Sequence, residues 1–358
     1  MIAGKSLDLE WINQVSSDNR GVDRILIEKV IRALLLLEGL AKVDLDFVFK
    51  GGTALMLLMD FPKRLSIDID IVVSNNPERL DRLFEEVVVQ QHFTRFEIQR
   101  RDTDLNIEKA HYRFYYHPIL TTRSEEEFIL LDILFEEAEY QNIIELPVSS
   151  KFVKREGDDL FVSVPSPEDL LGDKLTAFAP YTTGIPYLKG DRSMSMEIMK
   201  QLYDIGMLFD LSENIEVVKS TFKSFANKEL EYRNKVDITY DAVLEDIIQT
   251  SLCIVSRGAV NSGNFHELQS GIQRVSHFIF SESFYLDKAI ILASKAAYLA
   301  HLIRIDYKGA IDRFDDPVTV KEWKIDNPLW PRLNRLKRSN PEAFFYWYKA
   351  HQLIAKNQ

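Results

Sequence analysis

Two glycines and two aspartates near residue 50 combine the residue types that phosphate chemistry requires. Gly51 and Gly52 carry no Cβ, so a ligand can approach their backbone closely, and amides at a turn that opens a helix at Thr53 bind anions. Asp68 and Asp70 alternate with isoleucines, so both carboxylates point to one face of a predicted strand. The alternative is an ordinary half-exposed strand, whose isoleucines face the core and whose aspartates face water, because it shows the same alternation. The preceding turn favours a divalent metal held beside a nucleoside triphosphate.

A third carboxylate lies farther along the chain, in the segment FILLDILF. Asp132 shares its predicted strand face with Leu130 and Leu134, and a lone aspartate in a two-sided apolar strand is costly unless it is paired or ligates a metal. We predict that Asp132 binds metal and activates the attacking hydroxyl; a strand end or an arginine partner is the alternative. Mg²⁺ prefers such hard oxygen ligands, so Mg²⁺ is the predicted cofactor and an NTP the co-substrate.

Four further residues flank the glycines and the Asp-x-Asp pair. Lys50 precedes the glycines, whereas Arg64 and Ser66 precede the aspartates. Either cation can contact phosphate or remain a solvated surface charge. Thr53 places a hydroxyl at the head of the anion-binding helix, or is simply a residue of its first turn. We include these residues in the predicted nucleotide site.

Two charged residues in the second half of the chain stand in predicted helices. Lys174, in GDKL, can reach a phosphate as a point charge or be solvated. Asp204, in KQLYDIGMLFD, faces a cleft or makes a tertiary contact.

The C-terminal region alternates basic and aromatic residues. Such residues bind single-stranded RNA through phosphate contacts and base stacking, or they form the solvated face and the core of a last helix. The residues concerned are Lys321, Trp323, Lys324, Trp330, Arg332, Arg335, Lys337, Arg338 and the run Phe344 to Tyr348.

The predicted secondary structure that positions these residues changes near Pro165. Before it, apolar periodicity predicts a sheet flanked by helices; after it, the pattern is almost entirely helical, so the fold class is α+β with domains at 1–165 and 166–358. The expected strands are 47–49, 66–73, 93–101, 110–117, 128–135, 143–148 and 160–164. The expected helices of the first domain are 22–43, capped by Asp18 or Asn19, then 53–59, stopped by Pro62, and 77–90, which opens at Pro77.

Composition limits the class of protein. The chain has 358 residues and a net charge of −11, which argues against a general nucleic-acid coat but allows a local basic groove. The single Cys253 excludes an internal disulfide framework and a cysteine zinc cluster. Neither a signal peptide nor a membrane span is apparent, so we expect a cytoplasmic protein with no membrane contact. Zincin, Walker and serine-hydrolase motifs are not found.

Taken together, FKGGTAL, KRLSIDIDIVV, LLDILFE, EDLLGDKLTAF and KQLYDIGMLFD resemble the AbiEii/AbiGii toxin family, within the DNA polymerase β-like nucleotidyltransferases. These are toxins of bacterial abortive-infection toxin–antitoxin systems. The resemblance implies a nucleotidyltransferase fold with a mixed sheet, and a helical domain that closes over the nucleotide. It assigns the triphosphate to Gly51, Gly52 and Thr53, and the metal to Asp68 and Asp70. It further implies that Lys174 contacts the nucleotide and that Asp204 is an active-site carboxylate.

The resemblance also implies Mg²⁺-dependent transfer of a nucleotide from an NTP to a cellular acceptor, in some members the tRNA 3′ end. It implies a winged-helix antitoxin encoded nearby. Two alternatives stand beside this hypothesis. One is a non-catalytic module that binds nucleotide or a partner, and the other is a nucleotidyltransferase that modifies a small molecule such as an antibiotic.

Overall fold

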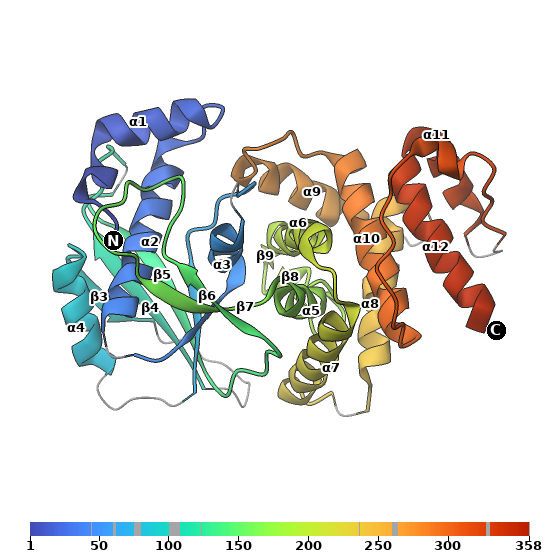
Figure 1. Ribbon diagram of the computed structural model, residues 1–358, viewed down its shortest axis with the longest axis horizontal. Coiled ribbons are helices and arrows are strands. Elements are labelled where there is room, and N and C mark those ends of the chain that lie inside the picture. The colour runs from blue at the N-terminus through green and yellow to red at the C-terminus, as the bar shows by residue number, and fades with distance from the viewer. Residues whose placement is uncertain are drawn as a thin grey trace. The chain divides into compact units, whose positions relative to one another are not determined.

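A computed structural model describes residues 1–43, 45–59, 62–74, 80–99, 108–122, 124–235, 237–259, 264–326 and 330–357. The chain divides into two compact units (Figure 1). The first comprises Met1–Ser166 and the short segment Phe278–Ser283; the second comprises Pro167–His277 and Phe284–Gln358. Each unit has its own hydrophobic core and is described by itself.

The first unit is built on a seven-stranded sheet with the strand order β3-β4-β5-β2-β1-β7-β6. The β2–β5 and β1–β7 pairs are parallel and the other pairs are antiparallel, so the sheet is mixed. All seven predicted strands are present, and the α+β fold class is confirmed. Their bounds are β1 Val48–Lys50, β2 Ile69–Val73, β3 Arg95–Ile98, β4 Lys109–Tyr116, β5 Glu127–Phe135, β6 Ile143–Pro147 and β7 Phe161–Pro165.

Helices α2 (Arg24–Lys42) and α4 (Leu80–Gln90) cover one face of this sheet. Their apolar stripes pack on alternate residues of the strands, such as Ile71 and Leu131, which are buried. Phe84 of α4 meets Phe114 of β4 edge to face, with ring centroids 5.4 Å apart. Burying such a side chain contributes about 1.5–3 kcal/mol. The polar alternate residues of the same strands therefore point to the other face.

The N-terminal region differs from the prediction. Helix α2 is capped by Asp23, whose side chain accepts a hydrogen bond from Ile25 N, and neither Asp18 nor Asn19 caps it. Asp18 instead ends a separate helix, α1 (Leu9–Asp18), which was not predicted and which follows a 3₁₀ turn, η1 (Gly4–Leu7). Trp11 of α1 donates its indole N–H to Phe152 O at 3.0 Å, and this bond ties the helix to the loop before β7.

The elements around the Gly-Gly turn are shifted by two or three residues. Helix α3 (Gly51–Leu58) begins at the first glycine rather than at Thr53. Strand β2 begins at Ile69, so Asp68 lies just before the strand and not within it. Helix α4 is described from Leu80; Pro77, the predicted first position of that helix, lies outside the described residues, as do the last two residues of the predicted strand 93–101.

A short segment from late in the chain completes the first unit. Residues 278–283 run beside residues 63–65, with an antiparallel bridge between Arg64 and Ile279 and a hydrogen bond from Leu65 N to Phe278 O at 2.8 Å. Phe280 packs edge to face on Phe152, with ring centroids 5.7 Å apart. These contacts with residues 278–283 hold residues 63–65, in the irregular stretch before β2, in place.

The second unit is almost entirely helical. Two helices of its core approach closely at Gly172, where an added Cβ would lie 2.8 Å from Val218 O. A glycine is therefore required for this packing distance. The elements are α5 Pro167–Ala177, β8 Leu188–Lys189, β9 Arg192–Ser193, α6 Ser195–Leu211, α7 Ile215–Tyr232, α8 Tyr240–Val255, α9 Phe265–Val275, η2 Ser276–Phe278, α10 Leu286–Arg304, η3 Pro317–Val320, η4 Pro331–Arg335, α11 Leu336–Ser339 and α12 Pro341–Asn357.

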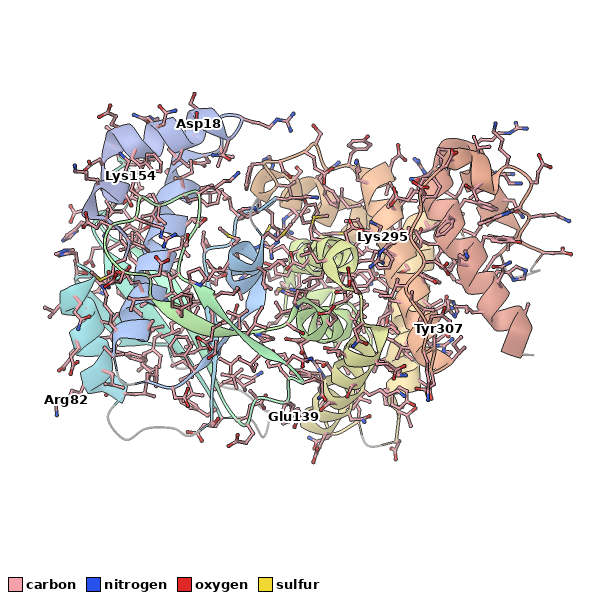
Figure 2. The ribbon with its side chains drawn as sticks, in the orientation of Figure 1. Asp18, Arg82, Glu139, Lys154, Lys295 and Tyr307 are labelled. Atoms are coloured by element: carbon pink, nitrogen blue, oxygen red, sulfur yellow. The ribbon has the colours of Figure 1, made fainter. Side chains whose placement is uncertain are left out.

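One buried ammonium group in the second unit is paired with carboxylates. Lys295, on α10 (Figure 2), is 5% exposed and contacts two carboxylates: Asp210 at 2.7 Å and Glu342 at 3.4 Å. A buried ammonium group is tolerated only with such partners.

The C-terminal aromatic residues belong mainly to the core of this unit. Trp330 is buried, as are Phe344, Phe345, Tyr346 and Trp347, so these rings are not available for base stacking. Of the two alternatives for these aromatics, the core interpretation is therefore confirmed. Among the described residues, no helix is both long and apolar enough to cross a membrane.

Candidate active site

Four polar residues form one row across the open face of the sheet. Strand register places Lys50 opposite Asp70, Asp70 opposite Asp132, and Asp132 opposite His111, on strands β1, β2, β5 and β4. Directly opposed residues of neighbouring strands project to the same face. Two carboxylates therefore lie side by side in the middle of the row, with a basic side chain at each end.

The surroundings of Asp132 differ from the prediction. Strand β5 is buried on one face only, because Ile129, Leu131 and Ile133 are buried while Asp132 lies on the half-exposed face, with 30% of its side chain exposed. The prediction that Asp132 lies in a strand with apolar residues buried on both faces is therefore wrong. Asp132 does have a partner, but it is a histidine rather than an arginine: His111 Nδ1 lies 2.6 Å from Asp132 Oδ1.

Sequence reasoning missed His111. The segment KAHYRFYY alternates polar and aromatic residues, and its burial alternates in the same way, so the pattern places His111 on the open face. Which strand lies beside β4, and in what register, is a tertiary property that this pattern does not contain.

The first glycine of the turn brings Asp70 to the head of α3. Gly51 has φ +82°, a conformation that favours glycine, and a Cβ at this position would overlap the carboxylate Oδ2 of Asp70. The Asp70 carboxylate thus packs directly on the backbone at the start of the helix. The N-cap residue of α3 is Lys50, whose side chain makes no capping hydrogen bond, and the first amides of a helix have no partner within the helix.

The second glycine brings two more predicted residues to the same place. A Cβ at Gly52 would lie 2.5 Å from Arg64 Nη2 and 2.7 Å from Ser66 Oγ. Arg64 is only 6% exposed, and its Nη1 donates to Leu65 O at 3.0 Å. The guanidinium is therefore held at the head of the helix and is not the solvated surface charge of the alternative reading.

Thr53 connects the helix to the aspartate segment. Its hydroxyl donates to the main-chain carbonyl of Asp68 at 2.7 Å, and the residue is fully buried. The hydroxyl thus fixes the backbone of Asp68, whose own side chain is exposed. Asp70, Arg64 and Ser66 consequently lie against the glycines at the head of α3, and the backbone of Asp68 is bonded to the same helix through Thr53.

The donor set suits Mg²⁺ bound together with phosphate. In the part of the chain that the structure describes, no group of three or more His, Cys, Asp or Glu side chains is arranged to hold a metal by itself. Asp70 and Asp132 are nevertheless adjacent carboxylates on one face. Mg²⁺ typically takes one or two carboxylates, with substrate phosphates and water completing its octahedron. The residues present therefore fit this ion in the presence of a nucleotide.

The second unit brings the other two predicted residues together. Lys174 of α5 and Asp204 of α6 form an ion pair with 3.0 Å between Nζ and Oδ2. Lys174 is 7% exposed and Asp204 is fully buried, so the solvated alternative for Lys174 is wrong. One turn earlier on α5, Asp169 accepts a hydrogen bond from Thr221 Oγ1 at 2.5 Å, and both residues are fully buried. Helix α5 therefore carries two internal carboxylate contacts.

A comparison with known protein families identifies the class of protein to which this chain belongs. The family described as "Nucleotidyl transferase AbiEii toxin, Type IV TA system" matches residues 35–323. The chain belongs to this family. It is therefore an AbiEii nucleotidyltransferase, and the match includes the glycine turn, both strands with carboxylates and the Lys174–Asp204 pair.

Solved structures give more distant similarities. A nucleotidyltransferase of Helicobacter pylori described as putative is 17% identical, with a TM-score of 0.41, and the match covers 78% of this chain and 94% of that one. JHP933 of the same species is 15% identical, with a TM-score of 0.41 and coverage of 84% and 94%. The nucleotidyltransferase toxin MenT4 of Mycobacterium tuberculosis is 13% identical, with a TM-score of 0.47 and coverage of 93% and 98%. No curated protein matches the sequence.

Proposed function

We propose that this AbiEii enzyme transfers a nucleotide from an NTP to an RNA acceptor, the tRNA 3′ end, in a reaction that depends on Mg²⁺. The observation that carries the proposal is the register of Asp70 and Asp132, with the Asp70 carboxylate packed on the backbone at the head of α3. Carboxylates suited to a metal and backbone amides suited to phosphate lie within one small region.

In this proposal the first amides of α3, from Gly51 to Thr53, bind the triphosphate, and Lys50 and Arg64 supply positive charge near it. Ser66, which reaches the same turn at Gly52, adds a hydroxyl. Asp68, Asp70 and Asp132 are the carboxylates that hold Mg²⁺. The ion, when bound, neutralises phosphate charge and aligns the reacting groups.

The transfer step needs an acceptor hydroxyl, which attacks the α-phosphorus. The new bond joins that oxygen to phosphorus, and the bond from the α-phosphorus to the oxygen bridging to the β-phosphorus breaks, so pyrophosphate leaves. The hydroxyl proton passes to Asp132. Its Oδ2 is suited to this role because, among the described residues, it has no hydrogen-bond partner, whereas Oδ1 is bound by His111.

Lys174 and Asp204 extend the proposal to the second unit. We propose, from the family resemblance, that Lys174 contacts the nucleotide and that Asp204 is an active-site carboxylate. Their pairing at 3.0 Å supports a coupled role, because Asp204 neutralises and orients the ammonium of Lys174.

An exposed basic segment in the second unit supports RNA as the acceptor. The side chain of Asn334 accepts from Ile325 N and donates to Ile325 O, so the segments 321–326 and 332–338 lie side by side. Phosphate contacts of such cations require no particular sequence. The exposed cations of these segments are Lys321, Lys324, Arg332, Arg335 and Arg338.

One experiment tests the reaction and its acceptor together. The purified protein is incubated with each α-labelled NTP, Mg²⁺ and total RNA, with parallel reactions containing EDTA or an aminoglycoside in place of RNA. We expect label on tRNA-sized RNA with at least one NTP, abolished by EDTA and by Asp70→Asn. Labelled aminoglycoside with no labelled RNA would overturn the RNA acceptor, and absence of any labelled product would overturn the reaction.

The family description implies an antitoxin, and we propose that it is a winged-helix protein encoded beside the toxin. Sequencing the flanking genes tests this. A neighbouring gene for a small winged-helix protein whose co-expression relieves growth arrest is the expected result, and a protective neighbour of another fold would contradict the proposal.

A further inference from the structure

The strand next to Asp132 carries a residue with no role in the reaction proposed above. His111, on β4, contacts Asp132 through one ring nitrogen and lies at the end of the polar row. We propose that His111 is a positioning residue, which holds the Asp132 carboxylate by Oδ1 and leaves Oδ2 for the metal and the acceptor hydroxyl. This inference rests on the proposed function, because it assigns the support for one of its carboxylates.

The contact is part of the sheet and not an incidental surface pair. The register sets His111 directly opposite Asp132, so the two Cβ atoms are held at cross-strand distance by the backbone. The side chain of His111 is only 12% exposed, and the Nδ1–Oδ1 separation is 2.6 Å. Because an ionised carboxylate only accepts, Nδ1 carries the proton and donates it to Oδ1.

Fixing one carboxylate oxygen has a consequence for the other. The terminal torsion of an aspartate is broad, so an unrestrained Asp132 carboxylate samples many orientations. A hydrogen bond to Oδ1 selects one of them. In the described part of the chain Oδ2 has no hydrogen-bond or ion-pair partner, so it is the oxygen that remains for a ligand.

The two carboxylates of the row are held in place by different contacts. Asp70 is restrained by Gly51, on whose backbone its Oδ2 packs, and it lies opposite Lys50. Asp132 is held by the hydrogen bond to His111. Partners that orient metal ligands typically change metal affinity or activity about 10–100-fold when removed.

The test compares a replacement that keeps a donor with one that does not. His111→Asn places an amide N–H close to the position of Nδ1, whereas His111→Leu has similar bulk and no donor. His117→Asn is the matched control, because His117 follows the same strand, is exposed, and its ring nitrogen Nδ1 lies 3.1 Å from the main-chain oxygen of Glu125 rather than beside a carboxylate. Two readouts are used: Mn²⁺ affinity in the presence of NTP, from the paramagnetic resonance of free Mn²⁺, and kcat and KM for transfer.

We expect His111→Leu to weaken Mn²⁺ binding about 10-fold or more and to lower kcat by a similar factor, with KM for NTP changed little. We expect His111→Asn to recover most of both losses and His117→Asn to resemble the wild type. Unchanged Mn²⁺ binding and kcat in His111→Leu would overturn the inference, as would an Asn variant that is as impaired as the Leu variant.

The two readouts separate this inference from the reaction itself. A wild-type protein that transfers no nucleotide defeats the proposed function, while Mn²⁺ binding still decides the role of His111. Thermal unfolding is followed for every variant, and His111→Phe replaces His111→Leu if the latter does not fold.

Discussion

Asp70 and Asp132 lie directly opposite each other on the parallel strands β2 and β5. Like charges in this position destabilise a sheet by about 0.2–1 kcal/mol, and the register places the basic side chains of Lys50 and His111 on either side of the two carboxylates. A protein retains such a pair where a cation is to be bound. Loss of one charge should therefore lower the activity of the protein far more than it changes the stability of the free protein.

Asp70→Asn tests this directly. We expect the free energy of unfolding to change by less than about 1 kcal/mol, because a repulsion is removed and the side chain keeps its shape. Transfer should fall about 100-fold or more, because one of the carboxylates proposed to hold Mg²⁺ is lost, and with it part of the ion's stabilisation of phosphate charge. Urea unfolding and the rate of label transfer measure the two effects. Asp81→Asn, an exposed carboxylate on α4, serves as control and should retain both properties; equal activity in the two variants would refute the role of Asp70.

Gly51→Ala tests the contact between the helix head and Asp70. Gly21 provides a matched control, because it also has positive φ (+73° against +82°) but has no atom within 4 Å of an added Cβ. Each alanine substitution carries the cost of a left-handed backbone, about 1 kcal/mol or more. We expect Gly51→Ala to cost additional stability, because its Cβ displaces the Asp70 carboxylate, and to abolish transfer.

The readouts for the two glycine variants are urea unfolding and label transfer. Gly21→Ala should lose stability and keep its activity per folded molecule. If Gly51→Ala were no less active than Gly21→Ala, the placement of Asp70 at the head of α3 would be unimportant for the reaction.

Replacing either partner of the Lys174–Asp204 ion pair should lower the free energy of unfolding. Removing one partner of a buried ion pair leaves an uncompensated charge and typically costs about 3–5 kcal/mol. We expect losses of this size for Lys174→Met and Asp204→Leu, and a smaller loss for the double variant, because both charges are then gone. Thermal and urea unfolding of the four proteins give the coupling between the two residues.

An exposed pair of the same unit provides the comparison. Arg257 and Asp287 are also close, at 2.9 Å, but their side chains are 59% and 58% exposed. Arg257→Met should cost less than about 1 kcal/mol. All variants of the Lys174–Asp204 pair, including the double variant, should lack transfer activity. An active double variant would show that the pair has only a structural role.

Local sequence patterns predicted most of the sheet and the candidate site residues on its inner strands, but not the contacts between distant segments. The glycines, the Asp-x-Asp pair and Asp132 are visible because their types and spacing are unusual in apolar strands. His111 and the return of residues 278–283 to Arg64 are not, because both depend on register and on pairing across long separations. Asp23 was missed as the cap of α2, since the apolar pattern continues upstream of it and does not mark the first turn.

His301 should make the second unit sensitive to acid. It lies on α10 against Trp330, with ring centroids 5.7 Å apart, and its buried Nε2 has no hydrogen-bond partner among the residues that the structure describes. Burial lowers the pKa of His301 from 6.5 to about 3, and the charge of Arg304 acts in the same direction. Above pH 6.5 the histidine is neutral in both states and contributes no pH dependence. As the pH falls below 6.5, only the unfolded chain takes up the proton, so the free energy of unfolding decreases by up to about 1.4 kcal/mol per pH unit.

His301→Phe removes this titration and keeps an aromatic ring against Trp330. We expect a flatter dependence of the free energy of unfolding on pH between 6.5 and 5 than in the wild type, measured by urea unfolding at several pH values. The slopes are compared rather than the absolute stabilities, because the larger ring itself perturbs packing. His266→Asn, an exposed histidine on α9, is the control and should keep the wild-type slope. Equal slopes in His301→Phe and the wild type would show that the acid sensitivity arises from other groups.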